Sequence, residues 1–193
     1  MPIADRLFAD EINTPIDRLN SFIITYPSLL QFFQRRDAIS SSDFVIATHM
    51  VYGWMPTMLE LYTNNPDGDL EWASHLLTSV KTGNDVTNAE LERLIKLVNN
   101  SLVGVSKLLH FAKPDKFSIW DSRVYRYFYQ EKPHFNRVRD ISKYRSFLDT
   151  FPEIINNEGF RRFFNSVINK MGYEVTPIRA IEVIMFLNGA REE

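Results

Sequence analysis

The sequence predicts an all-α fold, on three observations. Apolar residues recur at helical spacing along most of the 193 residues, alternating strand patterns are scarce, and residues that cap helices stand before several of the apolar segments. Typical helix lengths divide such a chain into about eight to ten short helices. We expect one compact helical domain spanning residues 1–193, with two lobes at about 1–100 and 101–193.

The first third of the chain contains the first expected helices. Residues 3–13 form one, and Thr14-Pro15 marks a restart, with Thr as the cap and Pro in the first turn. The apolar pattern continues from there to residue 33, with a break at Tyr26-Pro27-Ser28. Ser40 and its neighbours up to Asp43 then offer several N-caps for an apolar, buried helix at 44–52.

Three more helices are expected before residue 100. Gly53-Trp54-Met55-Pro56 ends the apolar helix and starts a short one at 57–62. After a turn rich in Asn, Asp, Pro and Gly, two amphipathic helices follow at 70–80 and 87–98. The second opens with a capping box formed by Thr87 and Glu90.

The last third of the chain ends in an apolar helix. A basic helix is expected at 141–148, and after Pro152 another runs over 158–171 and stops at Gly172. Thr176-Pro177 caps the final helix, which is too apolar for a free surface and should therefore dock into the core.

The stretch 104–128 contains the candidate site. An apolar helix at 104–111 leads through a Lys-Pro-Asp-Lys turn and a short apolar run to Asp121, which opens the next helix as its N-cap. Lys107 lies one turn into the first of these helices. A single turn between the two helices brings an amine and a carboxylate to one surface.

Two segments within this stretch resemble the helix-hairpin-helix DNA glycosylase superfamily, in particular its oxoguanine-glycosylase-like branch. They are Val103-Gly104-Val105-Ser106-Lys107 and Ser118-Ile119-Trp120-Asp121-Ser122-Arg123-Val124, and the resemblance covers residues 103–128. It implies a glycosylase-like helical fold with two lobes. Its catalytic residues are then Asp121 and Lys107, and its partner is DNA.

The resemblance assigns a role to each of these side chains. Asp121 stabilises positive charge on the sugar as the base leaves, and Lys107 acts as an amine nucleophile in an enzyme that also nicks the strand. A flipped base stacks on aromatic faces, for which Trp54, Trp120, Tyr125 and Tyr127 are available. The expected nucleic-acid-binding residues are Arg123, Arg126, Lys113, Lys116 and Trp120.

The charge distribution favours the same stretch as the part of the chain that contacts nucleic acid. The chain has a formal net charge of −2, yet residues 101–145 contain 10 Lys and Arg against 4 Asp and Glu. Contacts with phosphates need such a local excess of cations, although a solvated helix face has the same composition.

Structural alternatives stand beside each of these roles. A plain N-cap is the commonest role of an Asp in the position of Asp121, Lys107 is also typical of a solvated helix lysine, and large aromatic residues more often form a core than a stacking surface. The second function class is therefore a non-catalytic helical module that binds nucleic acid or protein, for example in a mobile element or a defence system.

Composition limits the remaining classes. The chain has no Cys, and its four histidines lack a metal-ligand spacing, so we assign no metal and no cofactor. The first 20 residues carry acidic side chains and no apolar segment of signal-peptide length, and no apolar run reaches the 18 or so residues of a membrane span. We therefore expect a cytoplasmic protein without a membrane partner.

Overall fold

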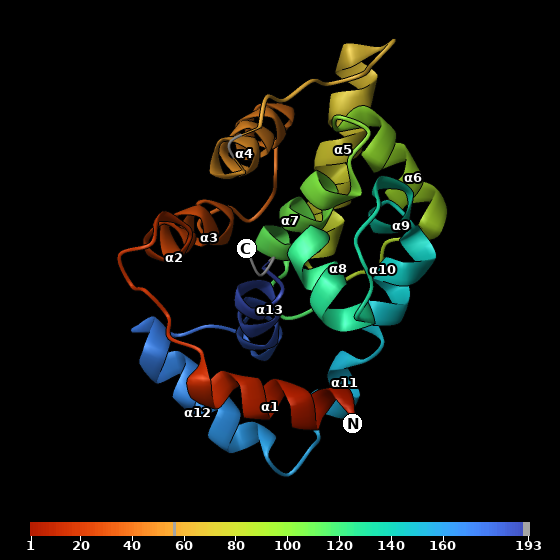
Figure 1. Cartoon of the computed structure of the whole chain (residues 1–193). Coiled ribbons are helices and arrows are strands. Elements are labelled where there is room, and N and C mark those ends of the chain that lie inside the picture. Colours follow the sequence, from red (N-terminus) through yellow and green to blue (C-terminus); the bar gives the residue numbers. More distant parts are fainter. Residues whose placement is uncertain (56, 191–193) are drawn as a thin grey trace.

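A computed structural model describes residues 1–55 and 57–190 of the chain, and these residues form an all-helical fold (Figure 1). Ten helices have eight or more residues, and three have four or five. In chain order they are α1 (Ile3–Asn13), α2 (Ser21–Ile24), α3 (Tyr26–Gln34), α4 (Ser41–Trp54), α5 (Pro66–Lys81), α6 (Asn88–Leu97), α7 (Leu102–Ala112), α8 (Ser122–Tyr129), α9 (Phe135–Val138), α10 (Ile141–Leu148), α11 (Phe151–Ile155), α12 (Phe160–Met171) and α13 (Pro177–Asn188).

Several helix ends lie where the capping signals predict them. Ser40 and Asp43 form a capping box at α4, and Thr87 and Glu90 form one at α6. The Thr176 side chain accepts a hydrogen bond from Arg179 N at the start of α13. These side chains satisfy amide protons that have no partner within the helix, which explains why each helix begins there.

The predicted restart at Thr14-Pro15 is wrong. The Thr14 hydroxyl donates back to the Asp10 carbonyl at 2.7 Å, so it terminates α1 instead of capping a new helix. The next helix, α2, begins only at Ser21, where Asn20 is the cap. The predicted break at Tyr26-Pro27-Ser28 is confirmed to within one residue, because α2 ends at Ile24 and α3 begins at Tyr26. Pro27 occupies the first turn of α3, where its missing amide proton costs nothing.

The predicted short helix at 57–62 is wrong as well. Tyr62 N donates to the Leu97 carbonyl, and Asn99 N donates to the Glu60 carbonyl, each at 2.9 Å. This segment therefore pairs with the end of α6 as an isolated antiparallel bridge between Leu61 and Val98. Pro56, which the sequence suggested as a helix start, lies outside the described residues.

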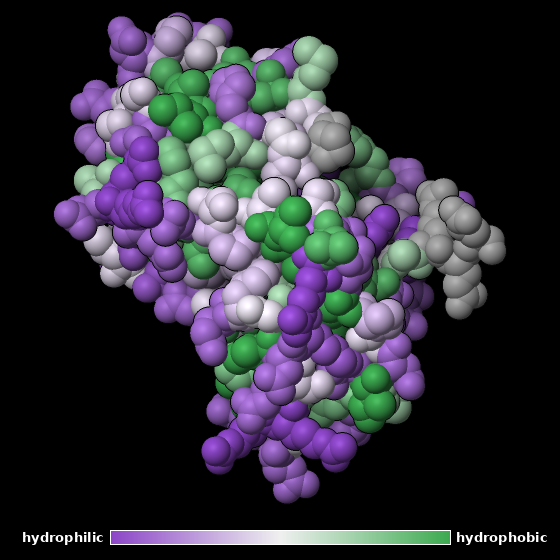
Figure 2. Space-filling view, turned by 90° about the vertical axis from the view of Figure 1, so that its left-hand side faces the viewer, coloured by the Kyte–Doolittle hydropathy of each residue, from purple (hydrophilic) through white to green (hydrophobic). Residues whose placement is uncertain are grey.

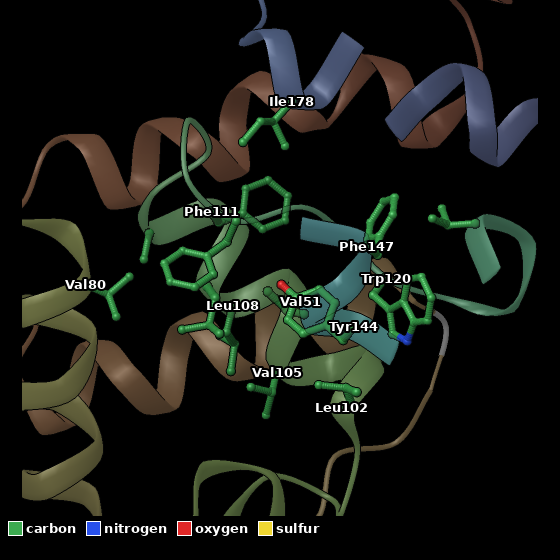
Figure 3. Packing of buried hydrophobic residues seen from close by; sticks show 14 of the residues in the cluster. Val51, Val80, Leu102, Val105, Leu108, Phe111, Trp120, Tyr144, Phe147 and Ile178 are labelled. Carbon is green, nitrogen blue, oxygen red and sulfur yellow. The ribbon is translucent and has the colours of Figure 1, made fainter. Parts of the chain in front are cut away.

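Helix α7 is the centre of the first group of helices. It packs against α3, α4, α5 and α6, and ten of its eleven residues are buried. Figure 3 shows Leu102, Val105, Leu108 and Phe111 following one another along this helix. A helix enclosed in this way needs apolar residues on every side, as its sequence has.

Helix α13 is the centre of the second group. It packs against α8, α1 and α12, and α1 in turn packs on α11 and α12 (Figure 1). The N-terminal helix thus belongs with the C-terminal helices, and α7 belongs with the helices before it. The packing groups therefore do not follow a division near residue 100.

The surface carries apolar side chains in several places. Figure 2 shows them among hydrophilic residues on the face where α2 and α3 lie. Large apolar side chains that are exposed include Leu19, Ile24, Met58 and Phe135. No helix in the described part of the chain is both long and apolar enough to cross a membrane.

Candidate functional site

Lys107 and Asp121 line the same cavity, which has a volume of about 660 Å³. Its walls come from the segment between α1 and α2, the end of α4, α7, the start of α8, and α13. The two helix groups therefore meet around it. The side chains that matter for its chemistry are Phe22, Trp54, Lys107, Asp121, Arg179 and Glu182.

Asp121 is the N-cap of α8, as the sequence predicts. Its Oδ1 accepts hydrogen bonds from Arg123 N and Val124 N, both at 2.9 Å. The bonds orient the carboxylate at the cavity wall, where the side chain is only half-buried. Both bonds use one oxygen, and no donor within the described residues bonds to Oδ2. A cap and a reactive carboxylate are therefore compatible in this side chain.

Lys107 is buried, with 8% of its surface exposed. Burial lowers the pKa of its amine, and the nearby carboxylates of Asp121 and Glu182 oppose that shift. Its Nζ lies 5.8 Å from the centre of the Trp54 ring. It forms no salt bridge with any residue that the structure describes. The alternative of a solvated helix lysine is therefore wrong. A buried amine of this kind loses its proton more readily than a surface lysine.

Arg179 and Glu182 also line the cavity, and the sequence interpretation missed both. They form a buried ion pair one turn apart on α13, and Arg179 also covers the Tyr26 ring at 4.6 Å. Burial raises the pKa of Glu182, and the adjacent Arg179 counteracts the rise. The signal that reveals them is a pair of charges three residues apart in an otherwise apolar helix, since buried charges require a partner.

His110 is a structural residue beside this pair. Its Nε2 is 2.9 Å from the Tyr26 hydroxyl and its Nδ1 is 2.8 Å from the Phe117 carbonyl oxygen. Burial and the nearby Arg179 charge lower its pKa to about 3, so the ring is neutral at physiological pH. It therefore adds no charge beside Lys107.

Aromatic side chains form one wall of the cavity. Trp54 and Phe22 meet edge to face with ring centres 5.5 Å apart, and Phe22 meets Phe186 in the same way at 6.2 Å. The Trp54 Nε1 donates to the Thr25 hydroxyl at 3.1 Å, which fixes the indole. Charged side chains of α7 and α13 line the same cavity, so its lining combines aromatic and charged groups.

Arg123 lines the cavity, and Arg126 lies beside it. Both line a second hollow of about 930 Å³, which shares Val103, Asp121 and Arg123 with the cavity. Arg126 Nη1 donates to the Gly189 carbonyl at 2.7 Å, and Arg123 lies 4.7 Å from the centre of the Phe186 ring. Asp121 therefore stands where the two hollows meet.

Lys113 and Lys116 line neither the cavity nor the second hollow. They follow the C-terminal end of α7, while Val103 and Asp121 lie near its N-terminal end. Lys116 bonds to the Gly83 carbonyl and to Asp85, and Lys113 pairs with Asp115. The basic stretch of the sequence thus divides between separate surfaces.

Trp120 lies in the core, contrary to the expectation that it contacts nucleic acid. Its side chain has no exposed surface, and its Nε1 donates to the Val138 carbonyl at 2.8 Å. Figure 3 shows it beside Tyr144 and Phe147. A side chain enclosed in the core cannot stack on a base, so its assignment as a nucleic-acid-binding residue is wrong. Tyr125 and Tyr127 are buried in the same way.

Within the described residues, no group of three or more His, Asp or Glu side chains is placed to hold a metal ion. Comparison of the chain with protein-family models, with curated proteins and with solved structures gives no significant match. The chemistry of the site is therefore argued from its own side chains.

Proposed function

We propose that this chain is a DNA-glycosylase-like protein that cleaves the N-glycosidic bond of a modified or damaged base. The observation that carries the proposal is the meeting of a buried amine, Lys107, and a helix-capping carboxylate, Asp121, in one cavity. The sequence resemblance names the same two residues, and their meeting in space is an independent requirement of that chemistry.

The amine supplies the nucleophile. Only a neutral amine carries the electron pair that attacks the sugar at its anomeric carbon, and burial lowers the pKa of Lys107 toward that form. As the new carbon–nitrogen bond forms, the bond to the base breaks and its electron pair leaves with the base. Loss of a proton from the attached nitrogen and opening of the sugar ring then give a Schiff base.

The carboxylate supplies charge. Positive charge develops on the sugar as the base departs, and a fixed carboxylate beside it lowers the barrier because it needs no reorganisation. Asp121 is fixed by its two amide hydrogen bonds through Oδ1. Its half-buried position at the cavity wall leaves it accessible to a substrate.

The cavity suits an extruded base. Its volume of about 660 Å³ lies within the range of small-molecule sites, roughly 300–1,000 Å³. Phe22 and Trp54 offer aromatic surface for a planar ring, as enzymes that flip a base out of the duplex require. Arg123 and Arg126, at the neighbouring hollow, are placed to contact phosphates of the same strand.

Borohydride trapping tests the proposal. Labelled duplexes carrying one uracil, one oxidised guanine, one methylated adenine or one abasic site are incubated with the full chain and then reduced. We expect a covalent complex with at least one duplex, because reduction converts a Schiff base into a stable amine. Lys107→Ala should abolish the complex, and Asp121→Asn should slow its formation by about 100-fold or more.

Lys113→Ala is the matched control, because this lysine follows the same helix but lies outside the cavity. It should trap as the unchanged chain does. Trapping that survives Lys107→Ala, or the absence of trapping on every duplex, contradicts the enzymatic proposal. Salt-sensitive DNA binding without trapping would then support the non-catalytic nucleic-acid module.

A further inference from the structure

The hollow beside Asp121 has features of its own. It has a volume of about 930 Å³ and extends from the start of α8 to α9. Its lining includes Arg123, Arg126, His134 and Phe135. The hollow and the cavity share Asp121. A chain-like ligand with one unit in the cavity can therefore continue into the hollow.

Phe135 is the unusual residue in the hollow. All fifteen phenylalanines lie in the described part of the chain, and Phe135 is the one of them that is exposed, at 66% of its surface. The Arg139 guanidinium covers its ring at 4.7 Å and also donates to Asn100 Oδ1 at 2.5 Å. One face of the ring is thus supported from the protein, and the side chain remains available to a ligand.

Cations lie near this ring, because Arg123 and Arg126 line the same hollow, and Lys132 and Arg137 line an adjoining one that shares Pro133 and His134 with it. Lys132, Arg137 and Arg139 come from the segment that carries Phe135, and Arg123 and Arg126 come from α8. Among the nearby acids, Glu131 pairs with Arg137 at 3.1 Å, and the Asp140 carboxylate caps α10. Residues 121–140 contain five Lys and Arg against three Asp and Glu, so the local field is positive.

We propose that this hollow binds a single-stranded segment of nucleic acid, with one unpaired base stacked on Phe135 and the strand's phosphates facing the surrounding cations. An exposed aromatic ring among cations is the arrangement that proteins use for single strands, since every base has a face to stack and every linkage has a charge. A partner protein of acidic character fits the cations but leaves the exposed ring unexplained.

The inference deepens the proposed function and does not depend on its chemistry. If Lys107 acts on an extruded nucleotide, the hollow holds the neighbouring nucleotide of that strand. If the cavity performs no reaction, the hollow still binds a strand. Binding is therefore measured on an undamaged oligonucleotide, where trapping by Lys107 plays no part.

The test is fluorescence anisotropy of a labelled 12-nucleotide deoxythymidine strand titrated with the full chain. We expect Phe135→Ala to weaken binding by about tenfold, because one stacked base typically contributes a factor of this order. Phe135→Trp should restore it, because an indole offers a larger stacking face. Lys132→Ala should lower the slope of log affinity against log salt by roughly one unit.

Met58→Ala is the control for loss of an exposed apolar side chain, since Met58 is 87% exposed and does not line the hollow. It should bind as the unchanged chain does. An unchanged melting temperature for Phe135→Ala shows that the loss is not one of folding. Equal affinity of Phe135→Ala and the unchanged chain, or no binding of the strand by either, overturns the inference. Phe135-dependent binding without trapping overturns only the proposed reaction.

Discussion

Gly104 shows how one residue constrains the centre of the fold. A Cβ built at this position lies 2.3 Å from the Tyr52 hydroxyl oxygen, far inside van der Waals contact. The glycine thus allows α4 to approach α7, the helix that carries Lys107, closely. The sequence resemblance assigns Gly104 to a hairpin. In the structure, the close approach of Tyr52 gives a steric reason for a glycine at this position.

Gly104→Ala should therefore destabilise the protein by about 1–3 kcal/mol, because Tyr52 and its neighbours must move to admit a methyl group. Urea unfolding followed by circular dichroism measures the change. The matched control is Gly53→Ala in α4, where a Cβ meets no atom within 4 Å. It should stabilise the protein by roughly 0.5–1 kcal/mol, because alanine favours a helix more than glycine does. Equal effects from the two substitutions would show that the contact with Tyr52 is not restrictive.

Helix α8 combines a structural and a proposed chemical role in its first residue. The two amide hydrogen bonds of Asp121 start the helix, and the same side chain borders the cavity. The sequence left open whether Asp121 is a cap or a reactive group. The structure shows the cap, and its position at the cavity keeps the second role available.

Two substitutions at Asp121 separate these roles. Asp121→Ala should cost about 1 kcal/mol of unfolding free energy, because α8 loses its cap, while Asp121→Asn should cost much less, because asparagine caps a helix about as well. Both should slow formation of the trapped complex by about 100-fold or more. Thermal and urea unfolding of the three proteins measure the first effect. If Asp121→Ala traps more slowly than Asp121→Asn, in line with its lower free energy of unfolding, then Asp121 acts only by stabilising α8.

At the scale of the whole molecule, α13 joins the two helix groups around a buried ion pair. The Arg179 guanidinium lies on the Tyr26 ring of α3, and Glu182 shares the cavity with Lys107 of α7. An ion pair taken out of water gains little net stability, but one ion left without its partner is very unfavourable. The pair therefore fixes how the groups meet more than it strengthens the fold.

Arg179→Met should accordingly lower the free energy of unfolding by about 3–5 kcal/mol, and the double variant Arg179→Met with Glu182→Leu should lose far less. Urea unfolding of the two single variants and the double variant completes a mutant cycle. Without Arg179, burial raises the pKa of Glu182 above its value in the unfolded chain. At a pH between these two pKa values the folded chain therefore binds a proton at Glu182 that the unfolded chain does not. The penalty of Arg179→Met should therefore shrink as the pH falls from about 8 to about 5.

Additive losses in that cycle would contradict the role given to the pair. A penalty for Arg179→Met that grows as the pH falls would show that Glu182 is not the buried acid responsible. Leu19→Ala is a suitable control, because this exposed side chain lies outside the pair and should change stability little at any pH.

The sequence by itself determined that the chain is helical, where most helices begin, and that Asp121 opens α8. These features depend on spacing and on side chains that bond to their own backbone, which are local properties. Its errors at residues 14–20 and 57–62 have the same origin, because a hydrogen bond back to Asp10 and pairing with α6 override the local signals there.

Only the tertiary structure decided which side chains share a space. Burial of Lys107, enclosure of Trp120 in the core, the separation of Lys113 and Lys116 from the cavity, and the ion pair of Arg179 and Glu182 all depend on how α7 and α13 pack. Contacts between segments far apart in the chain decide which of these side chains are buried, whereas residue spacing along α13 indicates only that Arg179 and Glu182 can pair.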